Sequence, residues 1–420
     1  MKTQSQAFKI FNVASGNFFE MFDFMVFGMF ASQIAKSFFP ASDPYLSLML
    51  SFVTFGTGFL MRPFGALILG SFIDKKGRKK GLLLTLGLMA FGTFIIAFTP
   101  NYAKIGIYAP LLVLFGRLIQ GFSAGAELGG VSVYLAEIAP IKHKGFYVSW
   151  QSASQQLAVV CSASFGFWLN KIFNITQMQE FGWRIPFIFG CMVLPLIFWL
   201  RNYLQESVSF KHAKHHPSIK DIIENTLSSI PLIMLCSFMV MLTTVSFYMI
   251  TAYTPIYAKE IIHLSTAHSF LIAICIGLTN FTLLPIMGTL SDKIGRKWQL
   301  IGFSSLFILT AYPSLNWLVN NPQFSHMLIV ELWFSFLYAG YNGAMVVTLT
   351  EVVPVQIRSL SFSLAYSIAT AIYGGFTPAI ATNLIHITHN SAMPAVWLTF
   401  AGVCSLIAVL ILSKKKLLLS

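Results

Sequence analysis

The chain has 420 residues, of which 56% are apolar and only 10% are charged, and its mean hydropathy is +0.73. Soluble domains carry about a quarter charged residues, and a soluble chain of this length could not bury so much apolar surface, so we expect a membrane-embedded protein. The net charge of +13 would suit a nucleic-acid binder, but the basic residues occur in short clusters between apolar runs, which argues against that class.

The first half of the chain contains six apolar stretches, each long enough at about 20 residues to cross a bilayer. They cover residues 11–35, 47–73, 81–99, 108–138, 146–170 and 184–201. The first stretch contains Glu20 and Asp23 and leads to no small-residue cleavage site. A cleavable signal peptide is therefore not expected.

The second half contains six similar stretches after a polar segment. They cover residues 228–254, 265–290, 299–318, 326–351, 359–386 and 394–413. We predict an all-α membrane protein with twelve transmembrane helices in two six-helix bundles. The bundles are expected at residues 1–201 and 227–420, joined by a cytoplasmic linker at 202–226.

Lysine and arginine are distributed unequally between the two sides of this arrangement. The clusters on the side of the N-terminus lie at 2–9, 75–80, 142–144, 201–220, 293–297, 358 and 414–416. The opposite loops hold only Lys36, Lys104, Lys171 and Lys259. Because Lys- and Arg-rich loops stay on the cytoplasmic side, both termini are predicted to be cytoplasmic.

Two short motifs occur once in each half. Gly70-Ser-Phe-Ile-Asp74-Lys-Lys-Gly77-Arg78-Lys79 recurs as Gly288-Thr-Leu-Ser-Asp292-Lys-Ile-Gly295-Arg296-Lys297, and Glu137-Ile-Ala-Pro140 recurs as Glu351-Val-Val-Pro354. Parallel halves of this kind place a substrate site between the bundles, near the middle of the membrane.

The doubled motif, between helices 2 and 3 and again between helices 8 and 9, resembles the signature loop of the major facilitator superfamily. Arg117-Leu-Ile-Gln-Gly121 resembles the second hallmark of that family. The resemblance covers essentially the whole chain and implies a secondary transporter. The proline-bearing motif of helix 5 that is associated with antiporters is missing from residues 146–170, which favours symport or uniport.

Further phrases resemble the metabolite–proton symporter branch of that superfamily. They are Gly16-Asn17-Phe-Phe-Glu20-Met-Phe-Asp23, Arg62-Pro63-Phe-Gly65, Gln120-Gly-Phe-Ser-Ala-Gly125-Ala-Glu127 and Gly182-Trp183-Arg184. Within the branch the chain is similar to bacterial citrate–proton symporters and their tricarballylate relatives, over residues 145–156, 247–255 and 341–345. The resemblance implies proton-coupled import of citrate or a related carboxylate.

Other functions are alternatives to citrate transport. Relatives on similar scaffolds carry α-ketoglutarate, shikimate, proline or betaine. A transporter-like nutrient sensor is a third hypothesis, although it would call for an extra cytoplasmic domain. An enzyme is not expected, because no catalytic set, metal site or cofactor motif lies outside the apolar runs. The expected partners are a small organic anion, protons and the lipid bilayer, for a monomer in a bacterial inner membrane.

Ionised side chains inside the predicted helices mark functional candidates, because each costs about 2.5–3.5 kcal/mol on insertion. The first half contains Glu20, Asp23, Arg62, Arg117 and Glu127, whereas the second half contains Glu331 alone. The coupling chemistry is therefore expected in the first bundle. Glu331 lies near the outer end of its helix, where we expect it to reach water.

Asp23 is expected to pair with a buried arginine. A helical rise of 1.5 Å per residue places Arg62 at a similar depth, whereas the family resemblance implies a pair with Arg117. A substrate carboxylate would compete for the arginine and favour protonation of Asp23, so that proton and anion bind cooperatively. The alternative is an ion pair with no role in transport. Glu20 and Glu127 are candidates for further proton sites or for helix packing.

Substrate binding is expected to combine Arg62 or Arg117 with neutral polar side chains that face the cavity. These candidates are Asn17, Gln151, Gln155, Tyr248, Asn280, Tyr338 and Asn342. The acids and arginines of the repeated motifs are expected to close the cytoplasmic side as a gate. The gating candidates are Asp74, Arg78, Glu137, Asp292, Arg296 and Glu351.

Overall fold

The computed structural model of the chain describes residues 6–76, 78–125, 127–192, 228–354, 357–415 and 417–418. Side chains are not described at 6–15, 71, 73–76, 78–79, 82 and 127–128. The regular secondary structure of the described ranges is all helical, without a strand. The predicted linker at 202–226 lies outside the described residues.

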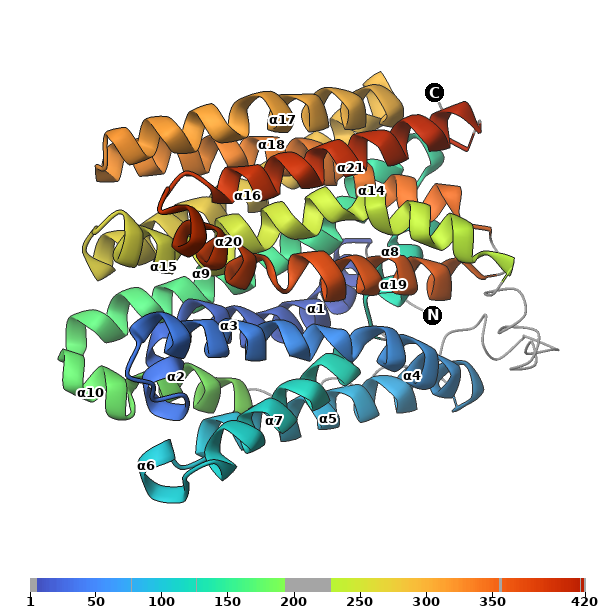
Figure 1. Ribbon diagram of the computed structural model, residues 1–420. Coiled ribbons are helices and arrows are strands. Elements are labelled where there is room, and N and C mark those ends of the chain that lie inside the picture. Colours follow the sequence, from blue (N-terminus) through green and yellow to red (C-terminus); the bar gives the residue numbers. More distant parts are fainter. Residues whose placement is uncertain are drawn as a thin grey trace.

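Most helices of the first half lie in the lower part of Figure 1, in blue to green. The helices of this half are α1 (Gln6–Met29), α2 (Ala31–Phe38), α3 (Pro44–Leu60), α4 (Arg62–Lys76), α5 (Arg78–Phe98), α6 (Tyr102–Ile105), α7 (Tyr108–Ala124), α8 (Glu127–Ile138), α9 (Lys144–Ile172) and α10 (Ile175–Glu180). Residues 185–192 are also helical.

The helices of the second half lie in the upper part of Figure 1, in yellow to red. They are α14 (Ile230–Tyr248), α15 (Thr254–Ile256), α16 (Thr266–Ile294), α17 (Arg296–Asn320), α18 (Phe324–Val352), α19 (Arg358–Ala369), α20 (Thr377–Thr388) and α21 (Pro394–Lys414). Three π-helical segments interrupt them, namely η3 (Met249–Tyr253), η4 (Tyr257–Ile261) and η6 (Thr370–Gly374). Helices α8 and α9 of the first half lie against α16, α18 and α19 of the second half.

These helices coincide with the predicted apolar ranges, and the sixth range is described only as far as residue 192. Seven stretches of the described residues are long and apolar enough to cross a membrane, or eight if the bent pair α1–α2 counts as one. Their outer surfaces expose apolar side chains such as Phe64, Leu278 and Phe400. A surface of that kind suits contact with lipid. The full count of twelve crossing helices stays a prediction.

The first predicted helix differs from a single straight segment. The chain bends by 67° between Gly16–Met29 and Ala31–Phe38, and the short helix α2 then packs against α3. The π-helical segments were not predicted either. A π turn inserts one extra residue into a helix, which leaves no signature in an apolar run.

The two halves pack most extensively through α9 and α16. Glycine makes the close approach possible, because a Cβ atom on Gly145 of α9 would clash with the backbone carbonyl of Gly288 in α16. Small residues at helix crossings are the usual device for bringing helices together in a membrane. Within the first half, Gly121 of α7 packs in the same way against the carbonyl of Gly58 in α3.

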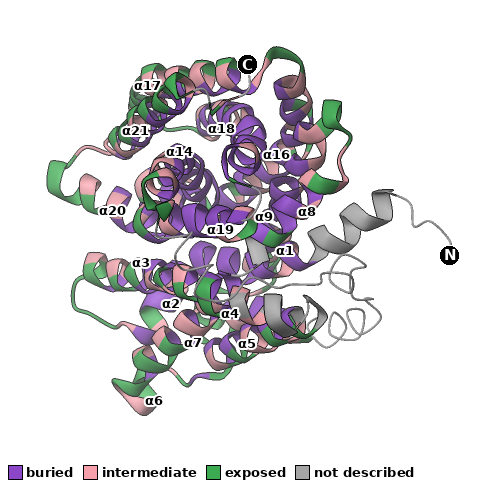
Figure 2. Cartoon of the chain, turned by 90° about the vertical axis from the view of Figure 1, so that its right-hand side faces the viewer, coloured by how far each residue is buried: buried purple, intermediate pink, exposed green. Residues whose placement is uncertain are grey.

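Buried residues gather where α1, α9, α14, α18 and α19 meet, as the view along the helices shows (Figure 2). The beginning of α1 and the end of α21 lie at the same end of the molecule (Figure 1), which we call the terminal end. The helices α2, α6, α10 and α15 lie at the opposite end (Figure 1), which we call the far end.

Because α3 and α7 approach each other closely at Gly121, we expect a larger side chain at this position to destabilise the protein. Gly121→Val should lower the free energy of unfolding by about 1–3 kcal/mol, because the helices would have to separate. Gly130→Val is the matched control, since a Cβ atom there meets nothing within 4 Å. Thermal unfolding of the purified variants in detergent measures the difference, and equal shifts for the two variants would contradict the packing described here.

Candidate functional site

Two arginines from the first half are buried against the same aromatic rings. Arg62 begins α4 and Arg117 lies in α7, and they are 1% and 0% exposed. The Arg62 guanidinium carbon lies 4.9 Å from the ring centroids of Phe24 and Phe59. The Arg117 guanidinium carbon lies 4.4 Å from the Phe24 centroid. Such cation–π contacts are favourable when desolvated, but they do not replace a counter-ion or hydrogen bonds.

Arg62 has a carboxylate partner. Its Nη2 donates to Glu20 Oε1 at 2.8 Å, and both side chains are buried. A buried guanidinium–carboxylate pair of this kind compensates both charges. The structure therefore places Glu20 with Arg62, and the predicted direct pair between Asp23 and Arg62 does not form.

Asp23 is connected to Arg117 only through two neutral side chains. The Thr93 hydroxyl contacts Asp23 Oδ2, Gln120 Nε2 donates to Thr93 Oγ1 at 2.9 Å, and Arg117 Nη1 donates to Gln120 Oε1 at 2.8 Å. The family resemblance implied a direct pair between the acid and this arginine. A hydroxyl and an amide instead separate the two charges in this arrangement.

Arg117 is a buried cation whose hydrogen-bond partners are neutral. Besides Gln120 it donates to the carbonyl oxygen of Phe55 at 3.3 Å, and its Nε has no hydrogen-bond partner among the described residues. Asp23 Oδ1 likewise lacks a partner within the described structure. A permanent positive charge in this state can accept a carboxylate ligand without first losing an ion pair.

Asp23 also borders a small hollow inside the first half. Its lining includes Gly16, Glu20, Asp23, Thr85 and Gly190, from α1, α5 and the helix over 185–192. Gly190 packs directly against the acid, because a Cβ atom there would lie 2.9 Å from Asp23 Oδ1. The rest of the lining is mainly apolar, from Phe19, Phe22, Leu86 and Met89, so the unpartnered Oδ1 of Asp23 is the polar group positioned to hold a water molecule there.

The second half contributes an aromatic wall to the site. The Tyr248 ring of α14 lies 5.7 Å from Phe55 and 5.1 Å from Phe59, the rings that also contact the arginines. Phe247 continues the wall to Tyr338 of α18 at 6.0 Å. The predicted residue Tyr248 is therefore within the site, as a ring from the opposite half.

Asn17 and Gln155 are joined to each other. Asn17 Nδ2 donates to the carbonyl oxygen of Gln151 at 2.7 Å and to the Ser154 hydroxyl at 3.1 Å, and Gln155 Nε2 donates to Asn17 Oδ1 at 3.1 Å. These bonds fasten α1 to α9. The Nε2 atom of Gln151 has no partner in the described structure, so its amide is the one of the three that is available.

Further polar groups lie unpartnered in the interior. Both side-chain polar atoms of Gln156 and of Asn280 have no hydrogen-bond partner among the described residues, and neither does Asn342 Oδ1. Asn342 Nδ2 donates to the Tyr338 hydroxyl at 3.4 Å. Gln156 was not predicted, although its position directly after Gln155 in an apolar helix was a usable signal. Buried amides of this kind are costly unless a ligand or water satisfies them.

Thr93 and Gln120 were also missed. Threonine is common in membrane helices, where its hydroxyl bonds to its own helix, and Thr93 does donate to the Met89 carbonyl at 2.9 Å. Gln120 stood within the arginine motif of α7, which could have indicated it. Their importance follows from their position between Asp23 and Arg117.

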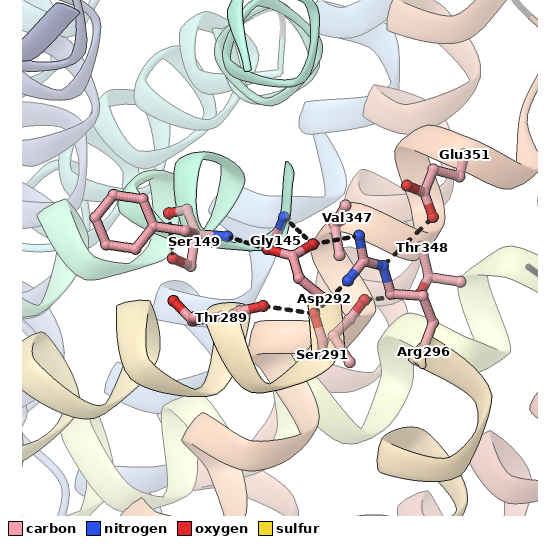
Figure 3. Close-up of polar contacts among 12 residues, drawn as sticks. Gly145, Ser149, Thr289, Ser291, Asp292, Arg296, Val347, Thr348 and Glu351 are labelled. Atoms are coloured by element: carbon pink, nitrogen blue, oxygen red, sulfur yellow. Dashed lines mark hydrogen bonds and ion pairs between the residues drawn. The ribbon is translucent and has the colours of Figure 1, made fainter. Parts of the chain in front are cut away.

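At the terminal end, the repeated motif of the second half closes onto the first half. Asp292 accepts hydrogen bonds from the backbone nitrogens of Gly145 at 2.9 Å and Phe146 at 3.2 Å, in the first turn of α9 (Figure 3). Arg296 Nη2 lies 2.7 Å from Asp292 Oδ1, and its Nε lies 3.5 Å from Glu351 Oε2. We call Asp292, Arg296 and Glu351 the latch.

The position of Asp292 in the latch follows from the chemistry of a helix N-terminus. A helix N-terminus presents unpaired N–H groups and a positive dipole end, which favour a carboxylate. Gly295 separates α16 from α17 with φ of +89°, a conformation that favours glycine. The three predicted gating residues of the second half are therefore brought together.

The remaining predicted residues have other positions. The side chains of Asp74, Arg78 and Glu127 lie outside the described part of the structure. Glu137 is exposed at the end of α8. Glu331 contradicts the expectation that it reaches water, because it is only 3% exposed and Thr254 Oγ1 lies 3.1 Å from its Oε1. Helix α18 is covered by its neighbours even near its end, so distance along a helix did not indicate exposure.

Comparison with known proteins agrees with the family resemblance of the sequence motifs. The family profile described as Major Facilitator Superfamily matches residues 13–311, and the profile described as Sugar (and other) transporter matches residues 209–414. The chain is 51% identical over 399 residues to the citrate-proton symporter of Klebsiella pneumoniae, which covers 95% of this chain and 90% of that protein. It is also 51% identical to the citrate-proton symporter of Salmonella typhi, over 95% of this chain and 92% of that protein.

The fold is similar to that of a solved proton:xylose symporter bound to 6-bromo-6-deoxy-D-glucose. The TM-score is 0.76 at 17% sequence identity, over 98% of this chain and 96% of that one. At this level of identity the likeness concerns the fold.

The buried Glu20–Arg62 pair predicts a measurable coupling. Glu20→Ala should lower the free energy of unfolding by about 3–5 kcal/mol, because it leaves a buried guanidinium group without its counter-ion. The double variant Glu20→Ala, Arg62→Met removes both charges and should recover most of the loss. Denaturant unfolding in detergent provides the double-mutant cycle. Additive losses, with no recovery in the double variant, would show that the pair is not coupled.

Proposed function

The chain belongs to the major facilitator superfamily, and from this membership we propose that it is a proton-coupled symporter that imports citrate, or a closely related tricarboxylate or dicarboxylate, by alternating access. The observation that carries the proposal is the state of Arg117. It is a buried permanent cation that no described carboxylate neutralises, at the contact between the two halves. The similarity to citrate-proton symporters along nearly the whole chain supports the choice of substrate.

The membrane arrangement proposed for this function has twelve crossing helices, in bundles at 1–201 and 227–420 with a cytoplasmic linker at 202–226. Both termini are placed in the cytoplasm of a bacterium, with the protein a monomer in the inner membrane. The distribution of lysine and arginine supports this orientation. So does the position of the start of α1 and the end of α21 at one end of the molecule.

Coupling in this proposal starts from the chain of hydrogen bonds between Asp23 and Arg117. A citrate carboxylate that binds Arg117 competes with Gln120 for the guanidinium group. Gln120 and Thr93 are then free to rearrange, and Asp23 loses the polar contacts that stabilise its charged form. A proton from the hollow beside Asp23 neutralises the acid. Each ligand therefore favours binding of the other, as linkage requires.

The membrane potential supplies a reason for proton coupling. Importing an anion against an inside-negative potential costs about 2.3 kcal/mol per charge for each 100 mV. Citrate carries several negative charges, so co-transported protons offset an otherwise prohibitive cost. Arg62 is already paired with Glu20, which leaves Arg117 as the primary anchor.

Neutral groups complete the proposed binding site. We assign a remaining carboxylate oxygen of citrate to the unpartnered Nε2 of Gln151, which can donate, and the citrate hydroxyl group to the unpartnered Oδ1 of Asn342, which can accept. Tyr248 closes the site from the second half. Asn17 and Gln155 hold the α1–α9 contact in place. The latch keeps the terminal end closed, and its release from the first turn of α9 opens that end to the cytoplasm.

Uptake into proteoliposomes tests the function directly. With an inward-directed proton gradient, labelled citrate should accumulate above its external concentration, and a protonophore should abolish the accumulation. Protein-free liposomes serve as the control. Accumulation of α-ketoglutarate or betaine without accumulation of citrate would overturn the substrate assignment.

The role of Asp23 is tested by separating net uptake from exchange. Asp23→Asn should lower gradient-driven citrate accumulation by at least about tenfold, because a proton can no longer be carried, while citrate–citrate exchange persists. Asp43→Asn is the matched control. Asp43 is an exposed acid that caps α3, and asparagine caps a helix equally well. Full accumulation by Asp23→Asn would remove Asp23 from the coupling mechanism.

A further inference from the structure

Glu331 is a buried acid in the second half that the mechanism above does not use. It lies in α18, 3% exposed, and no lysine, arginine or histidine of the described residues forms an ion pair with it. Its Oε2 has no hydrogen-bond partner in the described structure. An ionised carboxylate in this environment is strongly disfavoured unless something compensates its charge.

The contact with Thr254 indicates where a proton would lie. Thr254 Oγ1 is 2.8 Å from the carbonyl oxygen of Ile250, 3.2 Å from that of Met249 and 3.1 Å from Glu331 Oε1. A hydroxyl has a single hydrogen, and the shortest contact directs it to the carbonyl of Ile250. The contact with Glu331 is then satisfied by a protonated carboxyl group that donates to Thr254 Oγ1.

Asp23 has the same local chemistry in the first half. Thr93 contacts Asp23 Oδ2 and also donates to the carbonyl of Met89, four residues before it, just as Thr254 does to Ile250. Each half thus holds one buried acid against a threonine that also contacts a carbonyl oxygen of its own helix. Glu20 differs from both, because it has an arginine as counter-ion.

The surroundings of Glu331 offer a route from the far end. Thr254 lies in α15, between the π-helical segments η3 and η4, and irregular turns of this type frequently occur at functional sites. The next two residues, Pro255 and Ile256, line a hollow at the contact between the halves, together with Met29, Ser32 and Glu260. Opening of that contact would bring water to the threonine.

A line of polar side chains leads from Glu331 toward the centre of the molecule. Ser335, Tyr338 and Asn342 follow it at spacings of four, three and four residues, which places all four on one face of α18. The Ser335 hydroxyl and Asn342 Oδ1 have no partner among the described residues. Each step covers about 4.5–6 Å along the helix, a distance that a water molecule can bridge.

Other titratable groups near Glu331 are few. Tyr257 of η4 is within electrostatic reach, and its hydroxyl donates to the carbonyl of Ser391 at 2.8 Å. Lys259 and Glu260 pair with each other at the surface. The elements that pack against α18 are α8, α9, α14, α16, α17, α19 and η3, and no charged group of their described residues acts on Glu331.

We propose that Glu331 is a second proton-binding site, so that one transport cycle carries two protons, on Asp23 and on Glu331. The proton joins the Glu331 carboxylate from external water when the far end is open. It stays there while the protein is closed, and it leaves along the Ser335–Tyr338–Asn342 face when the terminal end opens. This inference rests on the proposed function of citrate–proton symport.

The number of protons per citrate is measured by the zero-flux method. Proteoliposomes hold a tenfold outward citrate gradient at zero membrane potential, at pH values where citrate is fully ionised, and the opposing pH difference that stops net flux is found. Two coupled protons balance this gradient at about half a pH unit and one proton at about one unit. The wild type should balance near half a unit and Glu331→Gln near one unit.

Glu180→Gln is the matched control, because Glu180 is an exposed acid of α10 at the same end and receives the same substitution. It should balance with the wild type. An identical balance point for wild type and Glu331→Gln would overturn the second site and leave citrate transport intact. Failure of the wild type to transport citrate would overturn the proposed function instead, which separates the two outcomes.

A second measurement tests the proposal without the Glu331→Gln variant, in case that variant does not insert into the membrane or transport citrate. The carbonyl band of protonated carboxyl groups is recorded by infrared spectroscopy on the purified Asp23→Asn protein without citrate. Because Glu331 holds its proton in the closed protein, a band from a buried protonated carboxyl group should remain at neutral pH. Absence of such a band would overturn the proposal.

Discussion

A guanidinium group keeps its positive charge even in an apolar interior, and the first half of this protein is organised around two such groups. Arg62 and Arg117 share the faces of Phe24 and Phe59. The charge of Arg62 is compensated by Glu20, whereas Arg117 donates to the side-chain amide of Gln120 and to the backbone carbonyl of Phe55. That difference makes the two arginines unequal. The paired one holds α4 to α1, and the unpaired one keeps the electrostatic potential that an anionic substrate needs.

Close packing is the second constraint, because charges can be arranged in this way only if helices approach one another closely. Glycines at the crossings of α3 with α7 and of α9 with α16 remove the side chains that would separate the backbones. The latch then joins the same two elements, α9 and α16, at the terminal end. A rigid contact and a breakable ionic one therefore lie on the same pair of helices, which suits a motion of one half against the other.

The halves share their repeated loop motif but differ in their interior chemistry. The first half contributes both arginines and Asp23, whereas the second contributes the ring of Tyr248, the polar face of α18 and Glu331. In our proposal the positive charge that attracts the anion comes from the first half alone. The second half closes the site and, in our proposal, holds a proton of its own.

The site is built from residues that are far apart in the chain, and the sequence alone predicted only some of its features. It determined the helix ranges, because crossing a bilayer requires about 20 apolar residues, and it singled out Arg62, Arg117 and Asp23, because charges stand out in apolar runs. The tertiary structure alone decided that Glu20 pairs with Arg62, that Thr93 and Gln120 separate Asp23 from Arg117, and that Glu331 is buried. The physical reason is that side-chain partners depend on how each helix is rotated and which helix covers it. Neither composition nor spacing along one chain contains that information.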